Sequence, residues 1–398
     1  MSSFLPYGRQ SIDQSDIDAV VETLRSDYLT TGPAVDRFEH DLAEAVGAKH
    51  AVVVANGTAA LHIAALTQDL KPNDTVIVPS ITFAASANCI AYCGAQVVFA
   101  DVDPETGLIT DDAFDEALAA IGPDYRFAGA IPVHYAGRAV DLSHISAVCR
   151  KSGAFLIEDA CHAIGTTGPQ GAIGACEASD MAVFSFHPVK TLTTGEGGAV
   201  TTDDPELARR LRLLRSHGIE RDPGHFEGLG YDGDGDNGPW VYEMQALGFN
   251  YRLPDLNCAL GISQLKRLPH FMARRATLVA RYHEALSATN LPVRWTSPEG
   301  QRPTFHLFAV SIDFEALGTT RTAVMQGLRE RGIGSQVHYI PVHRQPYWQT
   351  RALSQRELPG ADRYYRKTLS LPLYADMDDA DPARVVKALS EVLDVHAV

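Results

Sequence analysis

One lysine, Lys190, stands among hydroxyl-bearing residues and glycines in the stretch FSFHPVKTLTTGEGGAV, residues 184–200. The threonines and glycines beside it offer no carboxylate for a salt bridge at short range. A lysine held in a pocket without such a partner loses proton affinity and becomes a nucleophile toward carbonyl groups. The stretch therefore indicates a lysine that forms a Schiff base, although a surface lysine in a turn accounts for the same residues.

A second stretch has the features of a phosphate site. The apolar run AVVVA, residues 51–55, leads into Asn56, Gly57 and Thr58 and then into a helical pattern. The first turn of a helix offers free N–H groups, glycine allows close approach, and threonine adds a hydroxyl. An ordinary helix cap by Asn56 or Thr58 explains the same residues, because both types cap helices.

An acidic side chain, Asp159, ends the apolar run FLIED, residues 155–159. Ligands of open α/β sheets bind at the carboxyl ends of such strands. A carboxylate there needs a cationic partner or a group that it keeps protonated. Two other interpretations stay open at this stage: Asp159 could cap a following helix, and His162, three residues on, could be a packed core histidine.

The order of these residues along the chain indicates one kind of site. Gly57 and Thr58 follow an early strand, Asp159 ends a middle strand, and Ser185 and Lys190 come about thirty residues later. This set is typical of a site for pyridoxal 5'-phosphate (PLP), in which Lys190 forms the Schiff base. Asp159 would keep the pyridine nitrogen protonated so that the ring accepts electrons, and Gly57, Thr58 and Ser185 would bind the phosphate.

Strands with helices between them must position these residues. Helical patterns such as 57–66 alternate with short apolar runs, which predicts an α/β fold with a mainly parallel sheet. The predicted strands span residues 50–55, 75–79, 95–102, 127–134, 154–160, 180–186 and 197–202.

The pattern changes after residue 250, where one long helical stretch leads to a smaller α+β region. That region is predicted to contain strands at 304–312 and 335–339 and helices at 319–331 and 379–395. We therefore expect a large PLP-binding domain over residues 1–255 and a small C-terminal domain over residues 256–398, which begins with the long helix.

Composition restricts the classes of function. The 398 residues carry a formal net charge of -15, which argues against a nucleic-acid surface, because such a surface needs clustered Lys and Arg. The six cysteines form no CxxC pair; Cys89 and Cys93 could share a helix face, so a metal site is the alternative to the free thiols that we expect. We see neither a signal segment nor a membrane span, and expect a cytoplasmic protein with no membrane partner.

Nearly the whole chain resembles the DegT/DnrJ/EryC1/StrS family of sugar aminotransferases, which have the fold type I architecture of PLP enzymes. The resemblance rests on LTTGPAVDRFE, ANGTAALHIA, PSITFAASAN, IEDACHAIG, FSFHPVKTLTTGEGGAV, RSHGI, GFNYRLPDLNCALGISQLKRL and VHYIPVH, which are specific in combination. Within the family, QSIDQSDIDAV, TFAASAN, LRSHGI and IGSQVHYIPV are similar to the subgroup that acts in pseudaminic-acid biosynthesis.

The resemblance implies further roles for single residues. Phe83 would stack on the cofactor ring, and His162 would lie beside its phenolic oxygen as a third catalytic residue. Asn250, as a cofactor contact, and Arg252, as a substrate contact, would reach into a neighbouring subunit's site, so the active unit would be a homodimer. Contacts to the nucleotide sugar, with core or rim packing as the alternative, are implied for Tyr7, Thr31, His187, His338 and Tyr339.

The implied reaction moves an amino group from L-glutamate to C4 of a UDP-linked 4-keto-6-deoxy-N-acetylhexosamine. It follows a ping-pong scheme in which Lys190 acts as general base and then as general acid. A GDP- or dTDP-linked 4-keto-6-deoxyhexose is an alternative acceptor. A related sugar dehydratase is disfavoured, because such relatives carry histidine at the Schiff-base position. A non-catalytic binding protein on the same fold is the remaining alternative.

One acidic, glycine-rich segment, residues 225–247, does not match the subgroup. Asp232, Asp234, Asp236 and Glu243 fall at positions one, three, five and twelve of an EF-hand calcium loop. However, the sixth position lacks glycine, the eighth carries proline, and no helix pair flanks the segment. We therefore interpret it as a flexible, solvated loop and expect no metal.

Overall fold

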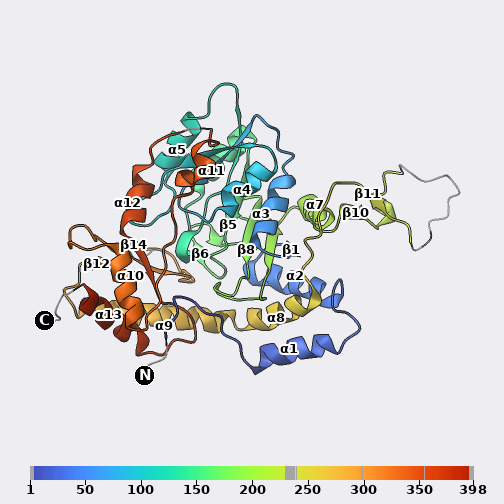
Figure 1. Ribbon diagram of the computed structural model, residues 1–398. Coiled ribbons are helices and arrows are strands. Elements are labelled where there is room, and N and C mark those ends of the chain that lie inside the picture. Colours follow the sequence, from blue (N-terminus) through green and yellow to red (C-terminus); the bar gives the residue numbers. More distant parts are fainter. Residues whose placement is uncertain (1–3, 229–237, 239, 297–298, 354, 394–398) are drawn as a thin grey trace.

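The computed structural model describes residues 4–228, 238, 240–296, 299–353 and 355–393 (Figure 1). A seven-stranded sheet lies at its centre, with the strand order β1-β9-β8-β5-β4-β2-β3. The strands are β1 (His50–Val54), β2 (Asp74–Pro79), β3 (Gln96–Ala100), β4 (Arg126–Ala130), β5 (Phe155–Asp159), β8 (Met181–Ser185) and β9 (Gly198–Thr202). The sequence therefore predicted each of these strands, with differences only at their ends.

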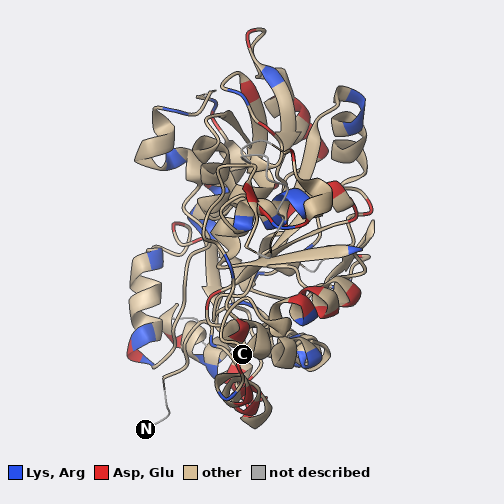
Figure 2. Ribbon diagram, turned by 90° about the vertical axis from the view of Figure 1, so that its right-hand side faces the viewer, with Lys and Arg blue, Asp and Glu red and all other residues tan. Residues whose placement is uncertain are grey.

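The direction of the strands agrees with the mainly parallel sheet that was predicted. Every neighbouring pair from β8 to β3 is parallel, and β9 alone is antiparallel, to both β1 and β8. The strands carry few charged residues, which lie mostly on the surrounding helices and loops (Figure 2).

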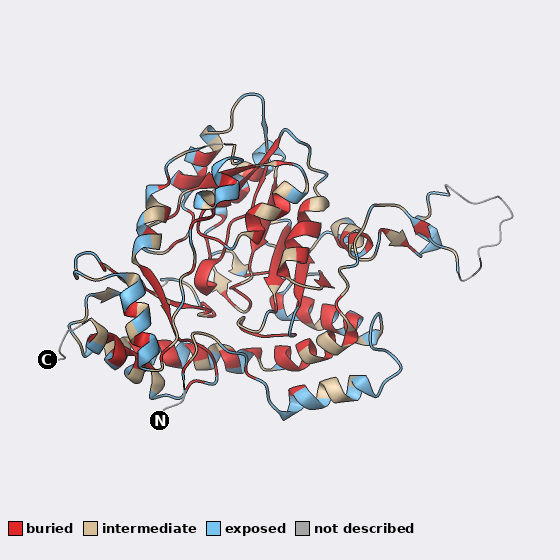
Figure 3. Ribbon diagram, viewed as in Figure 1, coloured by how far each residue is buried: buried red, intermediate tan, exposed pale blue. Residues whose placement is uncertain are grey.

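Helices cover both faces of this sheet. Side chains of a strand point alternately to opposite faces, so Val52 and Val54 pack under one helix layer while Ala51 and Val53 pack under the other. The first layer holds α3 (Gly57–Leu66), α4 (Ala85–Tyr92) and α7 (Pro205–Arg215). The second holds α2 (Pro33–Val46), α5 (Asp111–Ala119), α6 (Ser143–Ser152) and α8 (Asp255–Lys266). Figure 3 shows the sheet buried between them.

The long helical pattern after residue 250 forms two helices, which corrects the single helix predicted. Helix α8 ends at Lys266, and α9 (Leu268–Ser287) begins beyond Arg267 with Pro269 in its first turn. Proline has no N–H to donate to the preceding turn, so the hydrogen-bond ladder is interrupted there.

The C-terminal part has its own small sheet and core. Strands β12 (Val293–Arg294), β13 (Phe308–Ile312) and β14 (Thr368–Leu371) are antiparallel, and α9, α10 (Arg321–Glu330) and α13 (Asp381–Val392) pack against them. The predicted helices at 319–331 and 379–395 therefore correspond to α10 and α13. The domain boundary at residue 255 stays a prediction.

The predicted strand at 335–339 is wrong. Only Gln336 of this segment forms a bridge, to Ser370 of β14, a strand that the sequence did not predict. Residues 336–339 line a cavity instead of extending the sheet. Other short elements of the chain are β6 (Thr167–Gly168), β7 (Gly171–Ala172), α11 (Pro346–Gln349) and α12 (Pro359–Lys367).

Two segments lie at the periphery. Helix α1 (Gln14–Leu24) is largely exposed (Figure 3) and is joined to Arg267 by ion pairs of 2.6 Å with Asp16 and 3.0 Å with Asp13. The antiparallel pair β10 (Ile219–Glu220) and β11 (Glu243–Met244) projects from the body (Figure 1).

The calcium-loop hypothesis concerns three aspartates, Asp232, Asp234 and Asp236, that lie outside the described residues. Glu243 is described, and its carboxylate accepts the backbone N–H groups of Glu227 and Gly228 at 2.6 and 2.8 Å. Among the described residues no group of three His, Cys, Asp or Glu side chains is placed to hold a metal ion. Within the same residues, no helix is both long and apolar enough to cross a membrane.

Candidate active site

A cavity of about 870 Å³ opens where β1, β2, β5 and β8 end. Carboxyl ends of parallel strands meet at one edge of a sheet, and there the chain can place side chains from distant stretches side by side. The cavity lining includes eleven of the residues singled out from the sequence: Tyr7, Gly57, Thr58, Phe83, Asp159, His162, Ser185, His187, Lys190, His338 and Tyr339.

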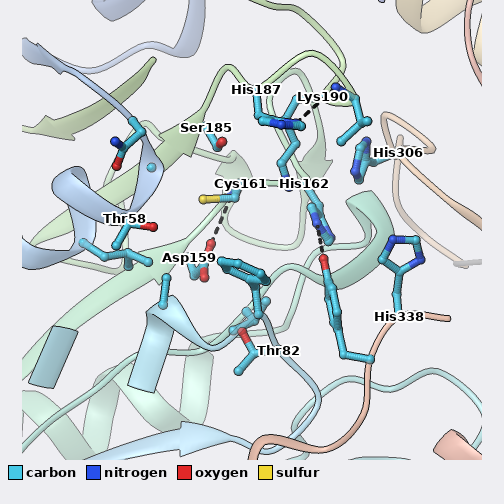
Figure 4. A pocket seen from close by; sticks show the side chains of 18 of the residues that line it. Thr58, Thr82, Asp159, Cys161, His162, Ser185, His187, Lys190, His306 and His338 are labelled. Carbon is cyan, nitrogen blue, oxygen red and sulfur yellow. Dashed lines mark hydrogen bonds between the residues drawn. The ribbon is translucent and has the colours of Figure 1, made fainter. Parts of the chain in front are cut away.

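The start of α3 forms one wall of the cavity. Asn56 is the N-cap of α3, and its side chain accepts the N–H of Ala59 at 2.8 Å. The interpretation of this stretch as a helix cap is therefore confirmed for Asn56. Thr58 is thus not needed as the cap and lies in the cavity wall (Figure 4). A Cβ on Gly57 would lie 2.9 Å from the Cβ of Ser185, so only glycine lets the helix start approach β8 this closely.

Asp159 lies at the end of β5 with both carboxylate oxygens engaged. One oxygen accepts the hydroxyl of Ser86 at 2.6 Å, and the other accepts the N–H of Cys161 at 3.1 Å. A turn follows Asp159, so the alternative of a helix cap does not hold. The side chain is buried at 4% exposure and faces the cavity, which makes it an anion directed at any ligand bound there.

Lys190 lies in a turn after β8, and its N–H donates to the carbonyl of His187 at 2.8 Å. Its side chain enters the cavity rather than bulk solvent (Figure 4), and the structure gives it no salt bridge within the described residues. Burial lowers the pKa of Lys190 below its ordinary value, while the charges of Cys161 and Asp159 oppose the shift. A lysine in this environment is the kind that attacks carbonyl carbons.

His162 is buried beside these groups. Its Nδ1 accepts the N–H of Ala136 at 3.3 Å, and its Nε2 lies 3.1 Å from the hydroxyl of Tyr339. Burial, followed by the charges of Lys190 and His338, lowers the pKa of His162 well below its ordinary value. The imidazole is therefore neutral at physiological pH.

The segment 336–339 closes the cavity from the C-terminal part. A series of hydroxyls fixes it: Thr368 donates to Tyr364 at 3.2 Å, Tyr364 to Tyr135 at 2.8 Å, and Tyr135 to the carbonyl of His338 at 2.8 Å. The His338 ring also bonds to Ser370 at 2.8 Å, and burial lowers its pKa to about 3. Hydrogen bonds therefore tie this wall both to Tyr135, in the segment after β4, and to β14 of the small sheet.

Three of the predicted residues do not line this cavity. Thr31 and Arg252 line a second cavity of about 600 Å³, formed where the end of α7 meets the segments before α2 and α8. Asn250 is exposed nearby and bridges to Ser216, whose hydroxyl also accepts from Arg252 at 3.2 Å. Within this chain, these three residues therefore lie apart from the cavity that Lys190 lines.

Several residues in or behind the cavity wall had no distinguishing signal in the sequence. Ser86 lies in the helix start after Phe83, and its contact with Asp159 depends on how α4 approaches the end of β5. His306 stands in an apolar stretch before β13, where nothing indicated a polar site. Cys161 and Tyr251 also line the cavity, and only folding brings them there.

The residues of the cavity fit PLP. The uncapped N–H groups of α3, with the hydroxyls of Thr58 and Ser185, suit a phosphate group. The Asp159 carboxylate suits a protonated pyridine nitrogen, and the Lys190 amine suits an aldehyde. The close approach of Gly57 to Ser185 leaves this cradle free of a side chain. The site thus has the donor set of a PLP-dependent enzyme.

Residues 10–390 match the DegT/DnrJ/EryC1/StrS aminotransferase family. The chain belongs to this family and is a PLP-dependent sugar aminotransferase.

Individual relatives agree over nearly their full lengths. The chain is 39% identical to the spore coat polysaccharide biosynthesis protein SpsC of Bacillus subtilis, covering 98% of this chain and 97% of SpsC. It is 27% identical to Helicobacter pylori PseC, an aminotransferase involved in the biosynthesis of pseudoaminic acid, with a TM-score of 0.84 over 98% of this chain and 100% of PseC. It is 25% identical to the PLP form of the putative sugar aminotransferase Spr1654 from Streptococcus pneumoniae, with a TM-score of 0.85 over 98% and 99% of the two chains.

Proposed function

We propose that this aminotransferase moves an amino group from L-glutamate to C4 of a UDP-linked 4-keto-6-deoxy-N-acetylhexosamine, as a step of pseudaminic-acid biosynthesis. The observation that carries the proposal is the likeness to PseC over the full length of both chains. Stretches such as IGSQVHYIPV, which supplies the wall at 336–339, support it.

The proposed cofactor contacts follow from the cavity walls. The start of α3 with Gly57 and Thr58, together with Ser185, binds the phosphate of PLP. Asp159 holds a proton on the pyridine nitrogen, Phe83 covers the ring, and His162 lies at its phenolic oxygen. When bound, PLP accepts the electron pair released at the α carbon of the amino donor.

Lys190 carries the proton in both halves of the proposed reaction. Its Nζ would take the proton from the α carbon of L-glutamate and pass it to the cofactor in the first half, and would carry a proton from the cofactor to C4 of the sugar in the second. The lowered pKa of Lys190 keeps part of the amine unprotonated, as a general base requires. The ring of Phe83 and the wall at 336–339 limit access of water to the reacting atoms.

Contacts to the sugar nucleotide are proposed for the rim of the cavity. Tyr7 packs against His338 with ring centroids 5.6 Å apart, and His187 lies exposed across the opening. Tyr339 lies deeper, beside His162. These side chains offer hydroxyl and imidazole groups to hydroxyls and phosphates of a ligand.

A homodimer completes the proposed site. Asn250, Arg252 and Thr31 lie away from Lys190 within one protomer, yet Arg252 has the guanidinium that suits phosphate groups. Several large apolar side chains of residues 12–29 are exposed, and one of them, Tyr28, lines the second cavity, as expected of a surface that another subunit covers. In the dimer these three residues serve the partner's cavity.

A subunit-mixing experiment tests the dimer. The variants Lys190→Ala and Arg252→Ala are each expected to be inactive as homodimers. After joint unfolding and refolding, mixed dimers contain one site with both native residues, so part of the activity should return. No recovery, with mixed dimers demonstrated by differently tagged subunits, would contradict the shared site.

The substrate assignment is tested with a panel of nucleotide sugars. First, the visible spectrum is recorded while L-glutamate is added, and the band of lysine-bound PLP should disappear. The aminated cofactor form is then mixed with UDP-4-keto-6-deoxy-N-acetylhexosamine or with GDP- or dTDP-linked 4-keto-6-deoxyhexoses, and products are identified by mass spectrometry. Amination of only a GDP or dTDP sugar would refute the UDP assignment.

One observation favours a different acceptor. The chain shares more identity with SpsC than with PseC, and SpsC is a protein of spore coat polysaccharide biosynthesis. A second candidate function is therefore amination of another nucleotide-linked keto-sugar destined for a cell-surface polysaccharide. The same panel separates the two, because the sugars differ in nucleotide and in the N-acetyl group.

A further inference from the structure

A buried histidine, His306, lines the cavity beside His162 (Figure 4). It is 4% exposed, and its ring packs on that of His162 with centroids 4.3 Å apart and 40° between the ring planes. Its Nδ1 is buried and has no hydrogen-bond partner among the described residues. The contact of His306 with His162 is therefore made through the face of the ring and not through a hydrogen bond.

The backbone that carries His306 is held in an unusual conformation. The preceding residue, Phe305, has a φ of +51°, a left-handed region that bulky residues rarely adopt. The guanidinium of Arg275 donates to the carbonyls of Phe305 at 3.2 Å, His306 at 3.1 Å and Leu373 at 3.1 Å. Arg275 is itself 2% exposed, and burial lowers its pKa to about 10. A buried cation thus fixes a strained segment whose side chain reaches the cavity.

A second residue with a left-handed backbone conformation contacts His162. Ala136 has a φ of +59°, and it is the residue whose N–H donates to Nδ1 of His162. Next to it, Gly137 admits the segment of His306, because a Cβ on Gly137 would lie 2.9 Å from the backbone nitrogen of His306. His162 is therefore contacted by Ala136, which has a left-handed backbone, and by His306, which follows a left-handed residue.

These contacts determine which nitrogen of His162 carries a proton. Nδ1 accepts the N–H of Ala136 and has no proton in the neutral ring, so the proton lies on Nε2. Nε2–H then donates to the Tyr339 oxygen, 3.1 Å away. Burial raises the pKa of Tyr339 well above its ordinary value, so Tyr339 keeps its own proton. That hydroxyl proton is left to donate to another group.

We propose that His306 is a positioning residue of this site: its ring fixes His162 in the orientation and tautomer that make the Tyr339 hydroxyl a hydrogen-bond donor to an oxygen acceptor in the cavity. The inference rests on the proposed function, in which the acceptor is a phenolic oxygen of the cofactor or an oxygen of the sugar. His306 acts through His162 and need not touch either ligand.

Three variants separate the ring contact from other effects. His306→Ala removes the ring, and His306→Phe keeps a ring of similar area without nitrogens. His283→Ala is the matched control, because His283 contacts Trp295 with ring centroids also 4.3 Å apart, and neither residue lines the cavity. His306→Phe should melt no lower than the wild type, since Nδ1, one of the two nitrogens that it removes, is buried without a partner among the described residues.

The first measurement needs no cofactor. Nitrogen NMR of the apoprotein with labelled histidine reports the proton on Nε2 of His162, assigned with His162→Gln. The signal of a single Nε2-protonated tautomer is expected in the wild type, in His306→Phe and in His283→Ala, and a mixture of tautomers in His306→Ala. A wild-type tautomer in His306→Ala would overturn the proposal, and so would a mixture in His306→Phe.

The second measurement locates the acceptor. PLP affinity of the apoprotein and KM for the sugar nucleotide are compared, and His306→Ala should weaken one of them by about tenfold, the effect of one hydrogen bond. An effect on PLP affinity indicates the cofactor oxygen, and an effect on KM indicates the sugar. Equal values for His306→Ala and wild type in both would refute the role. If the wild type transferred no amino group, the proposed function would fail while the NMR experiment still tested His306.

Discussion

The hydrogen bond between Ser86 and Asp159 yields a quantitative prediction. Ser86 is fully buried, and its hydroxyl lies 2.6 Å from an oxygen of the Asp159 carboxylate. In Ser86→Ala that oxygen loses its donor, and Thr82, 2.7 Å from the same hydroxyl, loses a partner as well. Hydrogen bonds to charged groups contribute about 1.5–3 kcal/mol, so we expect the apoprotein to lose about 2–3 kcal/mol of unfolding free energy.

Ser146 provides a control with the same distance and a neutral acceptor. This buried serine of helix α6 donates its hydroxyl proton to the carbonyl of Ala178, also at 2.6 Å. A neutral hydrogen bond contributes about 1 kcal/mol, so Ser146→Ala should cost roughly half as much as Ser86→Ala. The difference between the two variants reports the charge of the acceptor together with the lost contact of Thr82.

Urea midpoints of the two apoproteins measure this difference, and equilibrium dialysis measures PLP affinity. Ser86→Ala should weaken PLP binding by about tenfold, because Asp159 is no longer held in one orientation, whereas Ser146→Ala should leave it unchanged. If Ser86→Ala were no more destabilising than Ser146→Ala and bound PLP as tightly as the wild type, the assigned role of Ser86 would be refuted.

Two further changes have clear expected outcomes. Gly57→Ala places a Cβ 2.9 Å from the Cβ of Ser185 and should weaken PLP binding by about tenfold or more. Gly122→Ala is the control, because its Cβ would meet its nearest neighbour at 4.0 Å, and it should not change the affinity. Equal PLP affinities of the two variants in dialysis would contradict the phosphate site proposed at Gly57. Lys190→Met should stabilise the apoprotein at pH 7, because burial lowers the pKa of Lys190 in the folded wild type. The folded wild type therefore binds fewer protons than its unfolded chain and gains stability as the pH rises toward the ordinary lysine value of 10.5. The stability advantage of Lys190→Met should shrink over the same pH range. Urea midpoints at pH 7 and above 10.5 test this, and an advantage of Lys190→Met that failed to shrink with pH would refute the sign.

The central sheet was predictable because each strand is a short apolar run bounded by turn residues. Burial between two helix layers makes nearly every position of these strands apolar. The break at Arg267 was missed, since Pro269 suits the first turn of a new helix as well as a kink in an old one. The segment 335–339 was predicted as a strand and β14 was missed, because only pairing with β13, which the sequence does not record, distinguishes the two.

The residues of the candidate site are also of two kinds, those that the sequence places at strand ends and those that only folding brings together. Lys190, Asp159 and Gly57 follow strands, so the rule for strand ends brings them together without knowledge of other contacts. Ser86 contacts Asp159, and His306 contacts His162, through packing between segments far apart in the sequence, and no local pattern records these contacts. Arg252 and Thr31 share a second cavity, which a chain read in isolation does not connect with the first.

The hydroxyl series from Thr368 through Tyr135 to His338 also bears on how substrate preference can change. Any substitution in the inner wall must preserve a row of hydrogen bonds that joins two parts of the chain. The exposed rim residue His187, a proposed sugar contact, takes no part in that row. Directed evolution toward a new sugar should therefore accumulate its first substitutions at the rim, while the inner wall stays constant as an inherited framework for the chemistry.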